Sequence, residues 1–180
     1  MQRRLTMERF EATIPVKEYL AKYADFGRTL DACRKCGNYG TKWSCPPFDF
    51  DPVKDVWDKY TEVTILLYKM PLGEDRGLIT PDELTEMFFE NKKLLEQDLA
   101  KMAEAYPGSM IIGAGSCAIC SRCARQDGLP CRFRGKMRHS IESLGGLVPE
   151  TALGLFGIEV LWMENGRHPE YYILMEGLLH

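Results

Sequence analysis

Two apolar runs, VTILLY at residues 63–68 and MIIGA at residues 110–114, enclose the stretch that decides the fold, TPDELTEMFFENKKLLEQDLAKMAEAYPG at residues 80–108. Each short run is apolar on both faces, which is typical of a buried strand. The long stretch between them has helical periodicity. A strand, a helix and a second strand form a βαβ unit, so we expect the two strands to be parallel and joined by a right-handed crossover.

The helix is expected to run from Thr80 to Tyr106. Thr80 suits the N-cap, Pro81 suits the first helical position, and Glu83 completes a capping box. The pair Pro107-Gly108 ends the pattern. Apolar residues recur at helical spacing, namely Leu84, Met87, Phe88, Leu95, Leu99 and Met102. We interpret this face as core packing rather than as a cofactor-binding surface.

The rest of the chain adds shorter elements. Residues 158–163 (IEVLWM) and 171–175 (YYILM) predict two strands of an antiparallel hairpin, joined through turn residues. Helices are expected at residues 15–23, at residues 149–156 before Gly157, and from Asp51-Pro52 onward. The predicted fold class is α/β, with a mixed, mainly parallel sheet of about four strands flanked by helices and carrying cysteine-rich metal-binding loops. We expect a single domain over residues 1–180.

Composition places the chain among globular proteins. Of its 180 residues, 45% are hydrophobic, which suffices for a packed core. The net charge is −3, and a slightly acidic chain does not favour nucleic acid as a partner. The opening MQRRLTMERF has no apolar run after its basic residues, so we expect no secretory signal. Because no apolar stretch approaches the roughly 20 residues of a membrane span, we expect a soluble, cytoplasmic protein with no membrane partner.

Seven cysteines form two groups separated by a long segment without any. The groups are Cys33, Cys36 and Cys45, and Cys117, Cys120, Cys123 and Cys131. The odd count and the lack of an export signal argue against a disulfide framework. Cysteines that merely fill a core have no reason to adopt two-residue spacing twice. We therefore predict that all seven are metal ligands.

The second group, CAICSRCARQDGLPC at residues 117–131, has the spacing C-x2-C-x2-C-x7-C. Three cysteines at two-residue intervals suit three corners of a 4Fe-4S cluster, whereas a zinc site more often uses two separated C-x2-C pairs. Pro130 precedes the fourth cysteine instead of following it, so Cys131 closes the same cluster or ligates another. The group also follows the predicted strand at residues 110–114, and ligands bind beyond the carboxyl ends of parallel strands.

The first group, CRKCGNYGTKWSCPP at residues 33–47, provides only three cysteines. Its C-x2-C-G part resembles a zinc knuckle, and its Cys45-Pro46 pair resembles the cysteine-proline pair of ferredoxins. The vacant coordination position suits a non-cysteine side chain, Cys131 in a swapped arrangement, or solvent or substrate at an open iron. The predicted cofactor is therefore one or two 4Fe-4S clusters, with zinc as the alternative.

Basic residues concentrate beside the second group, because residues 117–139 contain six basic side chains against the single acidic Asp127. Guanidinium groups stabilise a negatively charged cluster and raise its reduction potential, so we predict cofactor-binding roles for Arg122, Arg132 and Arg134. The same charges suit an anionic substrate or an acidic redox protein, or they form a solvated basic loop. Nucleic acid is a weaker expectation, because no groove-reading motif accompanies them.

Catalytic motifs are missing from the sequence. It contains no Ser-His-Asp order, no P-loop and no G-x-G-x-x-G, so whether the protein is an enzyme stays open. Ser140 is a suitable N-cap for a helix through Ile141 and Leu144. We expect the preceding His139 at the surface beside this cap rather than as a metal ligand.

The chain resembles a family of small bacterial and archaeal proteins that are known only as predicted metal-binding proteins, a domain of unknown function. The resemblance rests on both cysteine motifs together with Tyr39-Gly40, Pro46-Pro47, Pro130-Cys131-Arg132 and Ser140-Ile141-Glu142, and it extends from about Cys33 to the terminal strands. It implies metal or iron–sulfur ligation by the seven cysteines and supplies no activity.

Three functional hypotheses follow. The leading one is an iron–sulfur protein that serves in electron transfer or as an accessory redox component, with a redox protein as its partner. The second is a zinc-stabilised binding module whose basic loop contacts an acidic partner. The third is an iron–sulfur enzyme in which Arg132, Arg134 or Arg138 fixes an anionic group at an open iron.

Overall fold

The apolar run VTILLY forms the middle of the longest strand, β2 (Glu62–Pro71), in the computed structural model of the protein. Every residue from Val63 to Tyr68 is buried, as the uninterrupted apolar pattern predicts. The structure describes residues 7–180. Residues 1–6, which are part of the opening segment in which we expect no secretory signal, lie outside the described residues.

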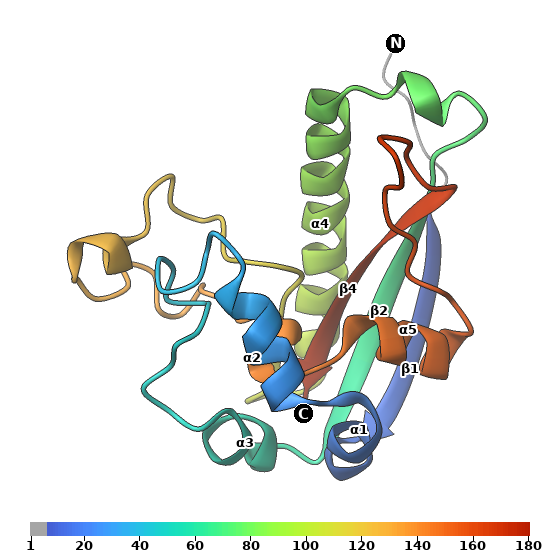
Figure 1. Ribbon diagram of the computed structural model, residues 1–180. Coiled ribbons are helices and arrows are strands. Elements are labelled where there is room, and N and C mark those ends of the chain that lie inside the picture. The colour runs from blue at the N-terminus through green and yellow to red at the C-terminus, as the bar shows by residue number, and fades with distance from the viewer. Residues whose placement is uncertain (1–6) are drawn as a thin grey trace.

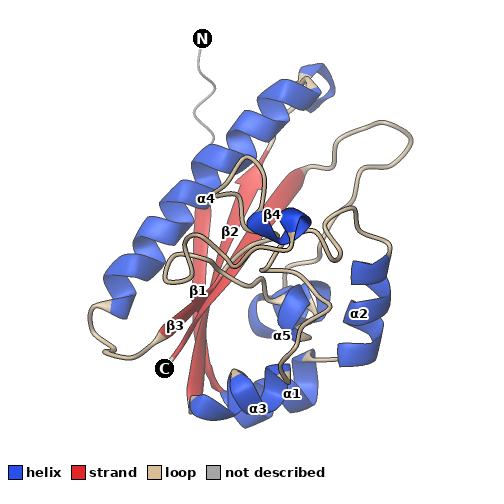
Figure 2. Cartoon of the chain, turned by 90° about the vertical axis from the view of Figure 1, so that its left-hand side faces the viewer, coloured by secondary structure: helices blue, strands red, loops and turns tan. Residues whose placement is uncertain are grey.

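The remaining elements form three layers. The other strands are β1 (Glu8–Pro15), β3 (Met110–Ile112) and β4 (Tyr171–Leu179). The α-helices are α1 (Val16–Tyr23), α2 (Phe26–Arg34), α3 (Pro52–Asp55), α4 (Pro81–Ala103) and α5 (Val148–Phe156). Short 3-10 helices lie at Trp57–Lys59, Arg76–Leu78, Ala124–Asp127 and Glu142–Leu144. Helix α4 covers one face of the sheet, and α1 and α5 lie on the other (Figures 1 and 2).

All four strands pair antiparallel, in the order β1-β2-β4-β3. The prediction of a mainly parallel sheet is therefore wrong. Strand β4 is inserted between the two strands of the expected βαβ unit, so β2 and β3 run in the same direction without pairing with each other. Both pair with β4, where Leu66 lies opposite Glu176 and Ile112 lies opposite Gly177. The α/β class and the four strands flanked by helices are confirmed.

Helix α4 confirms the predicted helix and its function in packing. Thr80 Oγ1 accepts a hydrogen bond from the Glu83 N–H at 3.3 Å, and Glu83 Oε2 accepts one from the Thr80 N–H at 2.8 Å, which completes the capping box. Leu95 and Leu99 are fully buried in one cluster with Leu66 of β2. Although α4 is the longest helix, no helix among residues 7–180 combines the length and the apolar character needed to cross a membrane.

The opposite face of the sheet holds the larger core, and this core fixes the chain that follows the second cysteine group. The Tyr19 ring of α1 stacks on Trp57 with the ring centroids 5.2 Å apart. Trp57 Nε1 donates a hydrogen bond to the Leu144 carbonyl at 2.8 Å. Gly145 has a φ of +96°, and a Cβ at this position would lie 2.4 Å from the Phe26 ring. Only glycine permits both the positive φ and the close contact with the Phe26 ring. The turn after residue 144 is therefore closely packed against α2.

The shorter predictions have mixed outcomes. The expected helices near residues 15–23, 52 and 149–156 are confirmed as α1, α3 and α5, with Gly157 ending α5. The predicted strand at residues 158–163 is wrong, because this segment has no regular secondary structure. Of the expected hairpin, the described chain contains β4 and an isolated bridge between Glu164 and Arg167. Strand β1 and helix α2 are elements that the sequence pattern does not predict.

Candidate metal centre

The seven cysteines lie in two segments that are neighbours in space although they are far apart in sequence (Figure 1). We name residues 33–47 the first cysteine segment and residues 117–139 the second cysteine segment. The first begins in the last turn of α2, and the second follows β3. All seven cysteines are free thiols, so each is available to a metal; six are half-buried, and Cys36 is exposed.

Tight turns in the first cysteine segment bring its thiols within electrostatic reach of one another. The Cys36 N–H donates a hydrogen bond to the Cys33 carbonyl at 2.9 Å, and the Asn38 N–H donates one to Cys36 Sγ at 3.5 Å. Burial raises the pKa of the Cys33 thiol, and the nearby Cys45, Glu142 and Cys36 raise it further. The three predicted ligands of this group therefore influence one another's charge.

The neighbours of Cys45 shift the pKa of its thiol in opposite directions. Burial raises the pKa of its thiol, while the hydrogen bond with Ser44, whose Oγ lies 3.7 Å from Cys45 Sγ, opposes this rise. The charge of Cys36 raises the same pKa, whereas the cations of Lys42 and Arg125 lower it. Hydrogen-bond donors and cations beside sulfur stabilise the thiolate, which is the form that binds metals.

Hydrogen bonds join the two cysteine segments directly. The backbone N–H of Cys117 donates to Ser44 Oγ at 3.1 Å. Lys42 Nζ donates to Ser116 Oγ and to the Cys117 carbonyl, each at 3.0 Å. Because Ser44 adjoins Cys45 in the chain, these bonds place the first cysteine of the second group beside the last cysteine of the first group.

Arg125 forms a second connection between the segments. Its guanidinium donates hydrogen bonds to three backbone carbonyls of the first segment, those of Lys42 at 2.9 Å, Cys45 at 2.6 Å and Pro47 at 2.5 Å. It also lies over the Trp43 ring, 5.1 Å from the centroid. The Trp43 indole N–H donates to the Leu129 carbonyl of the second segment at 2.9 Å. Arg125 therefore fixes the backbone on which Cys45 is carried.

The second cysteine segment winds around a short 3-10 helix, Ala124–Asp127, which ends at Gly128. Its four cysteines, Cys117, Cys120, Cys123 and Cys131, are all half-buried. Among residues 7–180, no three Cys, His, Asp or Glu side chains lie close enough together to hold a metal ion. The fold thus brings the two segments together without closing a complete ligand set around one point.

The three arginines predicted to bind a cofactor have different surroundings. Arg122 forms an exposed ion pair with Asp127 at 2.6 Å, which lowers the pKa of Asp127. Arg132 donates to the Arg122 carbonyl at 3.0 Å. Arg134 lines a cavity of about 590 Å³ together with Cys131 and Arg125. Their role beside a cofactor stays a prediction.

His139 is 7% exposed, so the expected surface position is wrong. Its Nδ1 lies 3.2 Å from the Ser44 carbonyl, and its ring meets Phe48 and Phe50 edge-on at centroid distances of 5.0 and 5.5 Å. Burial lowers the pKa of His139 and favours the neutral ring. The expected cap is present beside it, because Ser140 Oγ accepts a hydrogen bond from the Ser143 N–H at 3.1 Å.

Sequence reasoning missed the residues that join the two segments. Arg125 enters the sequence analysis only as part of the basic charge, because its acceptors lie 78 to 83 positions away. Lys42 is likewise marked only by its charge. Ser44 stands between Trp43 and Cys45, and a hydroxyl next to a ligand cysteine is a local signal that could have identified it.

The residues present fit a thiolate-bound metal in their chemistry. The described chain offers seven free thiols, an amide N–H directed at Cys36 Sγ, and the cations of Lys42 and Arg125 beside Cys45. Soft sulfur ligands select zinc and iron–sulfur clusters over magnesium or calcium. The site is therefore suited to a soft metal centre.

Residues 24–175 match the family model described as "Predicted metal-binding protein (DUF2284)". The matched range contains both cysteine groups and all the inter-segment contacts described above. Searches of the curated proteins and of the solved structures found no match.

Proposed function

Because the chain belongs to the DUF2284 family of predicted metal-binding proteins, we propose that its cysteine segments hold one or two 4Fe-4S clusters. The ligands would be Cys33, Cys36 and Cys45 in the first segment and Cys117, Cys120, Cys123 and Cys131 in the second. A bound cluster of this kind supplies one-electron redox chemistry. The protein then serves in electron transfer or as an accessory component of a redox enzyme.

The observation that carries this proposal is the hydrogen bond from the Cys117 N–H to Ser44 Oγ at 3.1 Å, which joins the segment of Cys33, Cys36 and Cys45 to the second cysteine group. Three thiols whose negative charges disfavour one another are costly to keep ionised without a counter-charge, and a metal centre supplies one. The two-residue spacing from Cys117 to Cys123 favours iron and sulfur over zinc for the second group.

The chain's own residues give the centre its surroundings. Arg125 and Lys42 place positive charge next to Cys45 and hold the backbone of both segments. The Trp43 and Phe48 rings line the cavity of about 590 Å³ that Cys131 also lines, and they add apolar surface beside this cysteine. Nearby positive charge and low exposure to solvent both tune the reduction potential of a cluster.

A redox partner is proposed to dock on the second cysteine segment. This segment exposes the basic Arg122 and Arg132 together with large apolar side chains: Ile119 is 45% exposed, Leu129 53% and Phe133 44%. Apolar contacts surrounded by positive charge suit a transient complex with an acidic protein surface. Binding of such a partner is expected to weaken at high ionic strength.

Anaerobic purification tests the proposal. We expect a brown protein with visible absorption that bleaches on reduction, and about four irons and four sulfides per cluster. EPR of the reduced protein, with and without added small ligands, reports whether a coordination position is open. A colourless protein with stoichiometric zinc would contradict the iron–sulfur proposal and support the zinc-stabilised module instead.

Two cysteine variants assign the ligands. Cys120→Ser is expected to deplete the metal of the second group and to leave the first group partly loaded, and Cys36→Ser is expected to do the reverse. The exposed Ser121, which adjoins Cys120, provides the control Ser121→Ala, which should retain all metal. Loss of all metal in both cysteine variants would argue that the two groups share one centre.

A further inference from the structure

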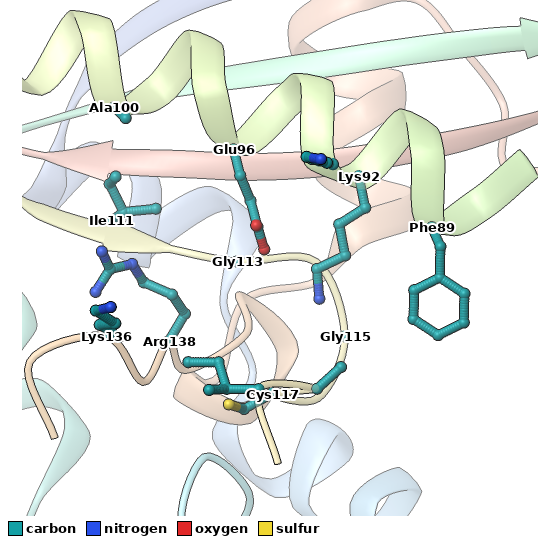
Figure 3. A pocket seen from close by; sticks show the side chains of 13 residues that line it. Phe89, Lys92, Glu96, Ala100, Ile111, Gly113, Gly115, Cys117, Lys136 and Arg138 are labelled. Carbon is teal, nitrogen blue, oxygen red and sulfur yellow. The ribbon is translucent and has the colours of Figure 1, made fainter. Parts of the chain in front are cut away.

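Helix α4, strand β3 and the second cysteine segment enclose a cavity of about 480 Å³, shown in Figure 3. We name it the cationic cavity, because its charged lining consists of Lys92, Lys93, Lys136, Arg138 and a single carboxylate, Glu96. Its volume lies within the range of small-molecule sites. Cys117 is the one cysteine in its lining, so the cavity is distinct from the space between the two cysteine groups and needs an explanation of its own.

The positive charges of the cationic cavity are not neutralised by the protein. None of its four cations forms an ion pair with a carboxylate of residues 7–180. Lys92 Nζ donates to the carbonyls of Ala114 at 2.7 Å and Ser116 at 3.4 Å. Arg138 Nη1 donates hydrogen bonds to the backbone carbonyls of Gly135 at 3.3 Å and Met137 at 3.4 Å. Neutral acceptors orient these cations without cancelling their charge, so the cavity attracts anions.

A buried carboxyl group lies beside Gly113, one of the residues that line the cavity. Glu176 of β4 is completely buried; its Oε1 accepts a hydrogen bond from the Ala114 N–H at 3.1 Å, while its Oε2 has no partner among the described residues. Burial raises the pKa of Glu176 to about 7, and the neighbours that affect this pKa include Glu96, Lys92 and Arg138 of the cavity lining. A carboxyl group with a pKa of about 7 is ionised only in part at neutral pH, so it offsets the nearby positive charges only in part.

Two exposed apolar side chains also line the cavity. Phe89 of α4 is 59% exposed and Ile119 of the second cysteine segment is 45% exposed, and both line the cavity. Figure 3 shows the Phe89 ring at one end, beyond Lys92, and the Arg138 side chain toward the other. Gly113 allows Arg138 to approach closely, since a Cβ at residue 113 would lie 3.3 Å from Arg138 Cβ. The cavity therefore offers a cationic part and an apolar part to one ligand.

We propose that the cationic cavity binds a small organic carboxylate, whose charged end contacts Arg138 and the lysines and whose apolar body lies against Phe89 and Ile119. The planar guanidinium of Arg138 suits the two oxygens of a carboxylate, and the lysines add charge without fixing a geometry. This site requires no metal, so it goes beyond the proposed cluster binding.

Titrations of the purified protein with simple carboxylates, followed by NMR, test the proposal. Hexanoate is expected to bind at least about tenfold more tightly than acetate, because its additional methylene groups bury apolar surface. Hexanamide, which has the same apolar body without the charge, should not bind measurably. Phosphate that binds as tightly as hexanoate, or hexanamide that binds equally well, would overturn the proposal.

Variants locate the binding within the molecule. Arg138→Gln and Lys136→Gln are each expected to weaken hexanoate binding about tenfold, because each removes a charge-assisted interaction. Phe89→Ala should weaken the binding of hexanoate but not that of acetate. Lys101→Gln, which removes an exposed cation from the same helix outside the cavity, is the matched control and should leave binding unchanged.

The result of the hexanoate titrations can be distinguished from the result of the metal analysis. Metal content and circular dichroism are measured on each variant, and only folded variants with the metal content of the unmodified protein are compared. A folded protein that fails to bind hexanoate would sink the cavity proposal whether or not it holds clusters. Equal weakening by Lys101→Gln would show general charge screening and would also overturn it.

Discussion

Ser44 Oγ accepts a hydrogen bond from the backbone N–H of Cys117 at 3.1 Å, across 73 positions of sequence. Ser44 is only 1% exposed, so this bond is shielded from competing water. It connects the residue before Cys45 with the first cysteine of the second group. This hydrogen bond therefore links the two cysteine groups without requiring a bound metal.

Ser44→Ala is expected to weaken both cysteine groups at once. The change leaves the Cys117 N–H without its acceptor in a buried position, which lowers the free energy of unfolding by about 1 to 3 kcal/mol. We expect lower metal retention at both groups, measured by metal analysis after dialysis against a chelator. Ser121→Ala, at an exposed position of the second segment, should match the unmodified protein. Equal behaviour of the two variants would refute the coupling.

Arg125→Gln and Arg122→Gln remove the same charge from the same segment but different contacts. Arg125 donates to three carbonyls of the first cysteine segment, whereas Arg122 pairs with the exposed Asp127. We expect Arg125→Gln to speed limited proteolysis within residues 33–47 several-fold and to reduce metal content, while Arg122→Gln leaves the rate of proteolysis there unchanged. Similar effects of both variants would show that charge, rather than positioning, is what Arg125 contributes.

The stability of the protein should fall as pH rises toward neutrality, because of Glu176. Its folded pKa of about 7 lies above the ordinary value of 4.5, so the folded state binds the proton more tightly than the unfolded chain does. The contribution is fully present below about pH 4.5 and is lost as pH rises through about 7. Integrated over that interval, the loss is about 2 to 3 kcal/mol.

Glu176→Gln is the variant that isolates this effect. Glutamine keeps the acceptor for the Ala114 N–H and stays neutral, so the pH dependence of chemical denaturation between pH 5 and 8 should flatten, by about 2 to 3 kcal/mol. We expect the variant to be more stable than the unmodified protein at pH 8. Glu90→Gln, at an exposed carboxylate of α4, serves as the control. A pH profile that Glu176→Gln leaves unchanged would contradict the assignment.

Gly145→Ala and Gly157→Ala compare two glycines with left-handed backbone. Gly157 has a φ of +67°, and a Cβ added there would meet no atom within 4 Å, so its replacement costs about 1 kcal/mol of backbone strain. At Gly145 the same strain is joined by a 2.4 Å overlap with the Phe26 ring, and we expect a loss of about 3 kcal/mol or more. Thermal and urea unfolding would measure both, and equal losses would show that Phe26 moves aside freely.

Local patterns in the sequence predicted the elements whose residues carry their own signals. The capping box of Thr80 and Glu83 marks the start of α4, and the apolar run after Glu62 marks β2. Strand order has no such local signal. The position of β4 between β2 and β3 depends on pairing between residues more than 60 positions apart, such as Leu66 with Glu176 and Ile112 with Gly177, which periodicity does not reveal.

The wrong strand at residues 158–163 has a similar cause. Its residues, IEVLWM, favour extended structure, but β2 and β3 already occupy both edges of β4. The expected hairpin with β4 therefore cannot form, because β4 has no free edge. Conversely, β1 with the sequence ERFEATIP is mostly polar at its start, yet it pairs with β2 along its full length.

For the metal centre, cysteine spacing was the informative part of the sequence. The intervals identify which residues belong to each group, because coordination requires close thiols within one segment. The contacts between the segments are of another kind. Arg125 and Ser44 act on partners about 70 to 80 positions away, and backbone carbonyls carry no sequence signature by which such partners are recognised.

The central place of β4 has a consequence for biosynthesis. A ribosome completes both cysteine segments before it reaches Tyr171–Leu179, the strand that joins β2 to β3. The cysteines are thus synthesised before β4, the strand that pairs with both β2 and β3. Delivery of a metal is therefore best suited to the time after β4 has paired, and chains interrupted before residue 171 would present seven unprotected cysteine side chains to oxidants.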